Sequence, residues 1–116
     1  MTTHQLKELS EKEIEEIRRD PLGISWYDVC SLYKLSEEFI REFQNYVNWY
    51  CVSFFQILSE NFIREFQDKL NWWGISVNQN LSKEFIAEFL CKLTLHRIVV
   101  NEKISQNVKD YCRMFI

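Results

Sequence analysis

A nine-residue segment recurs three times in this chain at a fixed spacing of 23 residues. It reads LSEEFIREF from Leu35, LSENFIREF from Leu58 and LSKEFIAEF from Leu81, and the three copies align without a gap. A period of this length is typical of repeat proteins, in which each repeat is one small unit that packs on its neighbours. The spacing therefore constrains the fold more than any other feature of the sequence.

Two less regular copies flank these three. The first, LSEKEIEEI, begins at Leu9 and is followed by three extra residues around positions 20–23, and the second begins at Ile104 and runs to Ile116. Units therefore start near residues 9, 35, 58, 81 and 104, which gives one domain of about four and a half units over residues 1–116. The chain has only two glycines and one proline, which favours helices joined by tight connections.

Each unit is predicted to be a hairpin of two helices. The first helix starts at a serine, which is a preferred N-cap: Ser10, Ser36, Ser59, Ser82 and Ser105. The second starts at an asparagine, Asn48 or Asn71, and ends near Gln56 or Gln79. Helices of about eleven and eight residues are too short to be stable alone, so neighbouring units must cover their apolar faces. We therefore predict an all-α, solenoid-like α/α stack.

Two columns of residues recur on the inner side of the predicted second helices. One is aromatic: Trp26, Trp49 and Trp72. Stacked units would place these rings one above another as the spine of the core. The other column consists of residues with small side chains: Cys30, Ser53 and Ser76. We expect it to let neighbouring backbones approach closely.

Two polar columns are expected to serve the structure of each unit. Gln56 and Gln79 face inward, so their amides should bond to backbone groups at the joint between units. A glutamate recurs at the border of the first helix: Glu16, Glu42, Glu65 and Glu88. It could be an array of acids and bases or hold a hard cation. We favour a ladder that accepts hydrogen bonds from the indoles or neighbouring caps and pairs with Arg41 or Arg64.

The sequence gives no indication of an enzyme, a metal site or a cofactor site. The cysteines form no C-x-x-C pair and have no histidine at a ligand spacing: Cys30, Cys51, Cys91 and Cys112. We expect them to be reduced thiols, buried or half-buried within helices, although disulfides are an alternative. The two histidines are His4 near the start and His96 in an aromatic column, and we assign neither a catalytic role.

The outer side of the second helices is the leading candidate for a binding surface. It carries aromatic and apolar residues: Tyr27, Tyr50, Phe54, Trp73 and Val77. Side-on neighbours in the stack could cover these side chains. If they stay exposed, they form the apolar, aromatic stripe typical of a protein-binding face. The leading hypothesis is thus a non-catalytic protein–protein interaction or structural module.

The last half-unit suggests a second surface. The first helix is polar enough to close one end of the stack, whereas the other end carries Met114, Phe115 and Ile116. Either these side chains fold back on the fourth unit or they meet a partner. We hypothesise self-association there, because a symmetric dimer would bury both faces at once.

Charge bears on the remaining classes of function. The net charge of -3 makes binding to the phosphate backbone of a nucleic acid unfavourable. Nucleic-acid (DNA) binding is nevertheless kept as the alternative function. It would require clustering of a few basic residues on one face: Lys69, Lys92, Arg97, Lys103 and Arg113. No apolar run approaches the roughly 20 residues that span a bilayer, and the polar start is not a secretory signal. These features predict an intracellular protein with no membrane partner.

The repeat also resembles a known group. The phrase LSEEFIREF, followed by Asn-Trp, a spaced aliphatic residue and Gln before the next Leu-Ser, resembles the short tandem-repeat proteins encoded by large DNA viruses such as marseilleviruses. The match covers residues 35–93 well and the flanks 9–34 and 94–116 weakly. The group has no agreed activity and no catalytic residues to carry over. The resemblance implies a viral or virus-derived protein in the host cytoplasm or nucleus, either a virion component or a protein aimed at a host factor.

Overall fold

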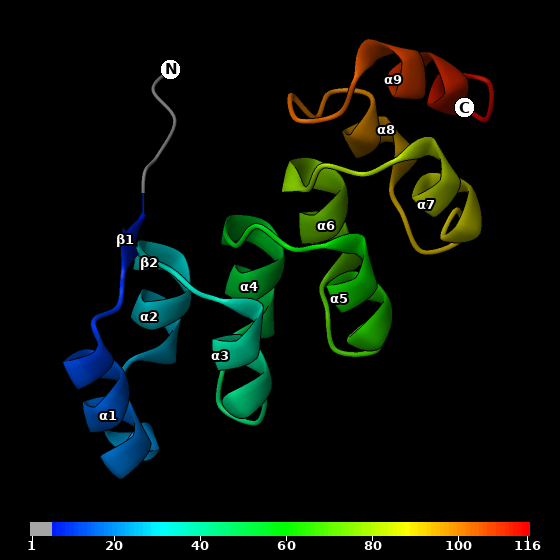
Figure 1. Cartoon of the computed structure of the whole chain (residues 1–116). Helices are drawn as coiled ribbons and strands as arrows, with labels where there is room; N and C mark the ends of the chain where they lie inside the picture. The colour runs from blue at the N-terminus through cyan, green and yellow to red at the C-terminus, as the bar shows by residue number, and fades with distance from the viewer. Residues whose placement is uncertain (1–5) are drawn as a thin grey trace.

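The computed structural model describes residues 6–116, and most of them are helical. The predicted all-α class is confirmed (Figure 1). The first helices of the units lie in one row: α1 (Glu11–Arg19), α3 (Glu37–Glu42), α5 (Glu60–Glu65) and α7 (Lys83–Glu88). The second helices lie in another: α2 (Trp26–Leu32), α4 (Trp49–Phe55), α6 (Trp72–Asn78) and α8 (Leu95–Ile98). Helix α9 (Gln106–Arg113) follows α8 and packs against it.

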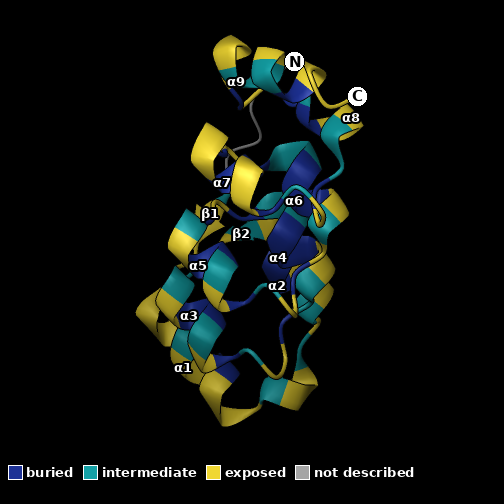
Figure 2. Ribbon diagram, turned by 90° about the vertical axis from the view of Figure 1, so that its right-hand side faces the viewer, coloured by how far each residue is buried: buried dark blue, intermediate teal, exposed yellow. Residues whose placement is uncertain are grey.

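The core lies between these two rows. Helix α2 packs on α4, α4 on α6, and α6 on α8, so each second helix contacts the next one along the chain. Figure 2 shows the buried segments turned toward the middle of the molecule and the exposed ones on the outer sides. The most deeply buried residues recur at equivalent positions of successive units: Ile40, Ile63 and Ile86 in the first helices, and Val52, Ile75 and Ile98 in the second.

The predicted helix starts are confirmed. Each of the five capping serines accepts a hydrogen bond from the backbone N–H three residues later, at 3.0–3.4 Å. Asn48 and Asn71 accept from the N–H groups of Cys51 and Gly74, both at 3.0 Å. These bonds satisfy N–H groups that a helix start otherwise leaves without a partner.

The first helices are shorter than the sequence suggests. Helix α3 spans six residues and ends at Glu42, because the backbone of the next residue, Phe43, leaves the helical region at φ -106° and ψ 28°. The Phe43 carbonyl then accepts from the N–H groups of both Tyr46 and Val47, which closes a tight turn. This turn keeps Val47 buried and directs the chain into the second helix, so the apolar pattern continues after the helix has ended.

The inward-facing glutamines bond to backbone across the joints, as predicted. The Gln56 Oε1 atom accepts from the Leu35 N–H at 2.8 Å, and Nε2 donates to the carbonyls of Cys30 and Tyr33 in the preceding unit. Gln79 repeats the arrangement on Leu58, Ser53 and Gln56. Asn101 continues the series by donating to the carbonyls of Ser76 and Gln79. One buried amide therefore joins each unit to the one before it.

The first unit has no such amide of its own. Tyr33 occupies the glutamine position there, at the end of the unit. The backbone at this position pairs directly with the segment that precedes the unit, as the parallel strands β1 (Lys7–Glu8) and β2 (Tyr33–Lys34), with Lys7 opposite Tyr33. The sequence did not predict this short strand pair.

The column of small residues also links neighbouring units. Ser53 is fully buried, and its Oγ accepts from the N–H of the next unit's cap, Asn71, at 2.8 Å while donating to the Trp49 carbonyl. The expectation of close backbone approach is met next to it, because a Cβ on Gly74 would lie 3.2 Å from the Ser53 Cβ.

The expectation of a tryptophan spine was wrong. The three rings are only half-buried, and within residues 6–116 they do not pack on one another. Each packs instead on a phenylalanine of the following unit, with Trp49 and Phe66 centroids 5.2 Å apart. Each indole N–H donates to the carbonyl five residues earlier, Gln44 in the case of Trp49. A tryptophan therefore links the turn of its own unit to the next unit.

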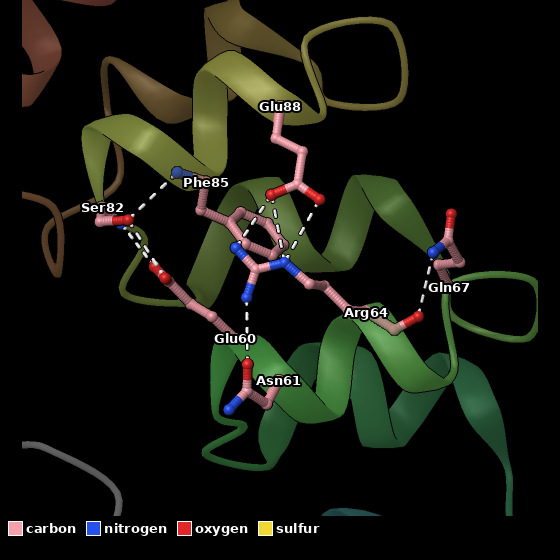
Figure 3. Close-up of polar contacts among 7 residues, drawn as sticks. All are labelled: Glu60, Asn61, Arg64, Gln67, Ser82, Phe85 and Glu88. Atoms are coloured by element: carbon pink, nitrogen blue, oxygen red, sulfur yellow. Dashed lines mark hydrogen bonds and ion pairs between the residues drawn. The ribbon is translucent and has the colours of Figure 1, made fainter.

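The glutamate column forms a ladder of ion pairs, as favoured above. Arg18 pairs with Glu42, Arg41 with Glu65 and Arg64 with Glu88, each across one joint. Hydrogen bonds from Arg41 hold the pKa of Glu65 below its usual range. Figure 3 shows Arg64 reaching Glu88, and its ring-facing contact with Phe85.

The expected bonds from this column to the indoles and caps are not made. The indoles donate to backbone, and the caps are served by another glutamate column at the first helical position. Glu37 accepts from the Ser59 N–H at 2.7 Å, and Glu60 accepts from that of Ser82 at the same distance. A carboxylate of one unit thus caps the first helix of the next (Figure 3).

Candidate protein-interaction surface

The predicted binding residues lie on the side of α2, α4 and α6 that points away from the core. We call this the outer face, defined by Tyr27, Tyr50, Phe54, Trp73 and Val77. Because an α-helix turns about 100° per residue, the side chains that follow the half-buried tryptophans point outward, while Val52, Ser53 and Gln56 point inward. The 23-residue period places Tyr27, Tyr50 and Trp73 at the second position of successive helices.

Three of the outer-face rings are well exposed. The exposed fractions are 56% for Tyr27, 45% for Tyr50 and 43% for Trp73, whereas Phe54 and Val77 are half-buried. The sequence left open whether neighbouring units cover these side chains or leave them exposed. In the structure, the neighbours cover them only in part. The exposed rings remain accessible on the side of the molecule opposite the charged row.

The rings on α4 and α6 form a continuous stack. Phe54 lies between Tyr50, at a centroid distance of 6.1 Å, and Trp73, at 6.0 Å, with interplanar angles of 18° and 21°. At the far side, the Arg97 guanidinium of α8 lies 5.9 Å from the Trp73 ring. Neighbouring rings that hold one another in place lose little conformational entropy when a partner binds.

The part of the outer face on α4 and α6 differs in charge from the row of first helices. Helices α4 and α6 contain no Asp, Glu, Lys or Arg. The row of α1, α3, α5 and α7, by contrast, carries the ladder of arginines and glutamates. Enrichment in aromatic residues and depletion of charge distinguish the centre of a protein interface from ordinary surface.

One further exposed residue belongs beside the outer face and was not predicted from the sequence. Val100, which follows α8, occupies the position in the repeat that Phe54 and Val77 hold, and it is 64% exposed. The repeat register was the signal that could have identified it. Ile57 is 73% exposed, but it lies after the end of α4, so helical spacing does not place it on the outer face.

The residues proposed for self-association are also exposed. Met114 is 78% exposed, and Phe115 and Ile116 are about half exposed, at 51% and 52%. The Phe115 ring lies edge-on against Tyr111 of α9, with centroids 5.2 Å apart. The structure therefore does not bring these side chains into the core.

The basic residues considered for nucleic-acid binding do not gather on one face. Lys69 and Lys92 lie in the turns after α5 and α7 and approach the rings of Trp49 and Trp72. Lys103 lies in the loop between α8 and α9. Arg113 pairs with Asp110 of its own helix at 3.1 Å.

The thiols and histidines add no catalytic arrangement within residues 6–116. Cys30, Cys51 and Cys112 are buried free thiols, and burial raises the pKa of Cys30 to about 11. Cys91 departs from expectation, because it is exposed and lies in the turn that follows α7 rather than within a helix. His96 is exposed, and His4 lies outside the described residues.

The same part of the chain contains no cluster of three or more His, Cys, Asp or Glu side chains able to hold a metal ion. It contains no helix with the length and apolar character needed to cross a membrane. Comparison of the chain with known protein families, curated proteins and solved structures finds no match. The function must therefore be argued from the surface.

Proposed function

We propose that this chain is a non-catalytic, solenoid-like repeat protein that presents its outer face to a protein partner. The observation that carries the proposal is the stack of Tyr50, Phe54 and Trp73 on two helices that bear no charge. A surface of this composition gains free energy when it is removed from water, and α4 and α6 contribute no charged side chain that binding would have to desolvate.

The solenoid-like arrangement is supported by the way the joints repeat. The same amide bridge recurs from Gln56 to Gln79, 23 residues on, and the ion pairs of Arg41 and Arg64 each reach a glutamate 24 residues ahead. Each unit bonds to its neighbours through equivalent atoms, which is the principle of a one-dimensional stack. Such a stack holds its outer face in a fixed shape.

The exposed apolar area is large enough to matter for binding. Four side chains at or beside the outer face are 43–64% exposed: Tyr27, Tyr50, Trp73 and Val100. Taking about 200 Å² for a fully exposed large side chain, they present roughly 400 Å². That lies within the range of the largest apolar patch on a typical monomer, and it is about half of the ~800 Å² that one partner contributes to a stable interface.

The proposal is tested by capturing partners from native extract with the full chain as bait. The double variant Tyr50→Ser/Trp73→Ser should retain its helical circular dichroism and lose the captured protein, because the two rings support the fold only partly. Leu22→Ser is the matched control, since Leu22 is 84% exposed in the short η1 helix (Pro21–Gly23), away from the outer face. Equal capture by all three proteins would refute the proposal.

Binding of nucleic acid has weaker support. The candidate cations lie at different edges, and three of them lie over tryptophan rings: Lys69, Lys92 and Arg97. A gel shift at about 50 mM salt that collapses as salt rises would favour this alternative over the outer face.

Self-association through Met114, Phe115 and Ile116 is a separate proposal, supported by their exposure. Light scattering at high micromolar concentration should show a dimer that Phe115→Ser dissociates, and a strictly monomeric mass would contradict it. The viral origin and intracellular location implied by the repeat motif also remain proposals.

A further inference from the structure

A groove of about 340 Å³ opens on the first unit and is lined by residues of α1 and α2. Its apolar lining includes Ile17, Ile24 and Val29. Three acids line it as well: Glu13, Glu16 and Asp20. A volume of this size lies at the lower end of the range for ligand pockets.

The repeat register shows what this groove corresponds to in the other units. Ile17 stands where the second unit has Phe43, and Glu16 stands where it has Glu42. In the second unit both positions contact the preceding unit, because Trp26 packs on Phe43 at 5.4 Å and Arg18 bonds to Glu42 at 2.6 Å. The groove is therefore the receiving half of a joint between units.

The later joints repeat this chemistry. The Trp49 ring packs on Phe66 with the centroids 5.2 Å apart, and Arg41 pairs with Glu65 at an N–O distance of 2.8 Å. In each of these joints, the surface of one unit thus binds the same pair of groups from the preceding unit, an indole ring and a guanidinium. The molecule itself shows which side chains this kind of surface binds.

The groove has the apolar and acidic groups of such a surface, but no preceding unit supplies an indole and a guanidinium to it. Within residues 6–116, no basic side chain forms an ion pair with Glu16, and the indole of the first unit, Trp26, packs on Phe39 and Phe43 of the second unit. Glu13 replaces the phenylalanine found at positions 39, 62 and 85, which leaves room beside the apolar floor. Its carboxylate accepts from the Ser10 N–H at 2.9 Å, so the helix start needs no cap from another unit.

We propose that this groove is a second binding site, which takes an aromatic side chain with a basic group beside it from another protein. The ring would lie on Ile17, Ile24 and Val29, and the cation would pair with Glu16 or Asp20. This site is independent of the outer face, since it lies at the end of the stack and uses other residues.

A second copy of the chain does not match the site in the repeat register. Its fourth unit has Ala87 at the position of Arg64 and Leu95 at the position of Trp72. It therefore lacks both the guanidinium and the indole that the other joints supply. We therefore take the occupant to be a different protein with an exposed aromatic and basic pair; a second copy would have to present such a pair outside the repeat register, as Trp73 and Arg97 do.

The test uses two small indoles of opposite charge on the full-length chain. Tryptamine carries an indole and an ammonium group, whereas indole-3-acetate carries an indole and a carboxylate. In ¹⁵N–¹H correlation spectra, tryptamine should shift the amide signals of α1 and α2, and indole-3-acetate should leave them unchanged at equal concentration. The variant Glu16→Gln/Asp20→Asn should weaken tryptamine binding at least about five-fold, and Glu38→Gln, an exposed acid on α3, should leave it unchanged.

Three results would overturn the proposal. Equal shifts with both indoles would show that the acids do not select the ligand. Shifts confined to α4 and α6 would place the indole on the outer face. Concentration-dependent sedimentation that disappears in Glu16→Gln/Asp20→Asn would show that the occupant is a second copy of this chain.

Discussion

Replacing Gln79 with leucine tests whether the buried amides hold the units together. Gln79 is 2% exposed and makes three hydrogen bonds: Oε1 accepts from the Leu58 N–H at 3.1 Å, and Nε2 donates to the carbonyls of Ser53 at 3.0 Å and Gln56 at 2.6 Å. Leucine has nearly the same volume and is more apolar. The substitution therefore removes the bonds and keeps the packing.

The loss of stability follows from the groups left without partners. A buried N–H that loses its acceptor costs about 2 kcal/mol, and each of the two carbonyls costs about 1 kcal/mol. We therefore expect Gln79→Leu to lower the free energy of unfolding by about 4 kcal/mol. For a chain of this size, that corresponds to a fall in melting temperature of about 15 °C.

Urea denaturation followed by circular dichroism measures this change, with Gln67→Leu as the matched control. Gln67 is half-buried and makes one bond, to the Arg64 carbonyl at 3.0 Å, so its replacement should lower stability by less than about 1 kcal/mol. If Gln79→Leu were as stable as the natural chain or more stable, the amide would not stabilise the joint, and the reasoning would be refuted.

Three other predictions concern caps, ion pairs and thiols. Ser59→Ala should destabilise the fold by roughly 1 kcal/mol more than Ser36→Ala in denaturant titrations, because only Ser59 also bonds to a carboxylate of the preceding unit; equal losses would contradict this. Because its arginine lowers the pKa of Glu65 in the folded state, the stability from this pair is present at neutral pH and is lost as pH falls through that lowered pKa. The melting temperature of Glu65→Gln should therefore fall less between pH 7 and pH 3 than that of the natural chain. With a thiol-specific reagent, Cys91 should react at once and Cys30 only on unfolding, since the former is exposed and the latter is buried; rapid reaction of all four thiols would contradict the fold.

Local rules explain what the sequence predicted correctly. The serine caps, the inward glutamines and the pairing of Arg41 with Glu65 follow from helix termini, from the need to satisfy buried amides and from charge. These rules act within a unit or between equivalent positions of adjacent units. A fixed period transmits them along the chain.

The features that the sequence missed depend on three-dimensional neighbours. Helical periodicity places Trp49 on one face, but it does not show that Phe66 of the next unit, rather than another tryptophan, lies against it. The direct pairing of Lys7 with Tyr33 involves only two residues per strand, too few for a recognisable pattern. The exposure of Tyr50 likewise depends on how closely the second helices pack, which the period leaves undetermined.

The binding role of the outer face is tested most directly by a footprint of the partner on the chain. Hydrogen exchange should be compared between the free protein and its captured complex. We predict slower exchange in α4 and α6, with side-chain protection of Tyr50 and Trp73 from oxidative labelling, and no change in α3 and α5. Protection confined to the charged row of α3 and α5, with Tyr50 and Trp73 labelled as in the free chain, would contradict it.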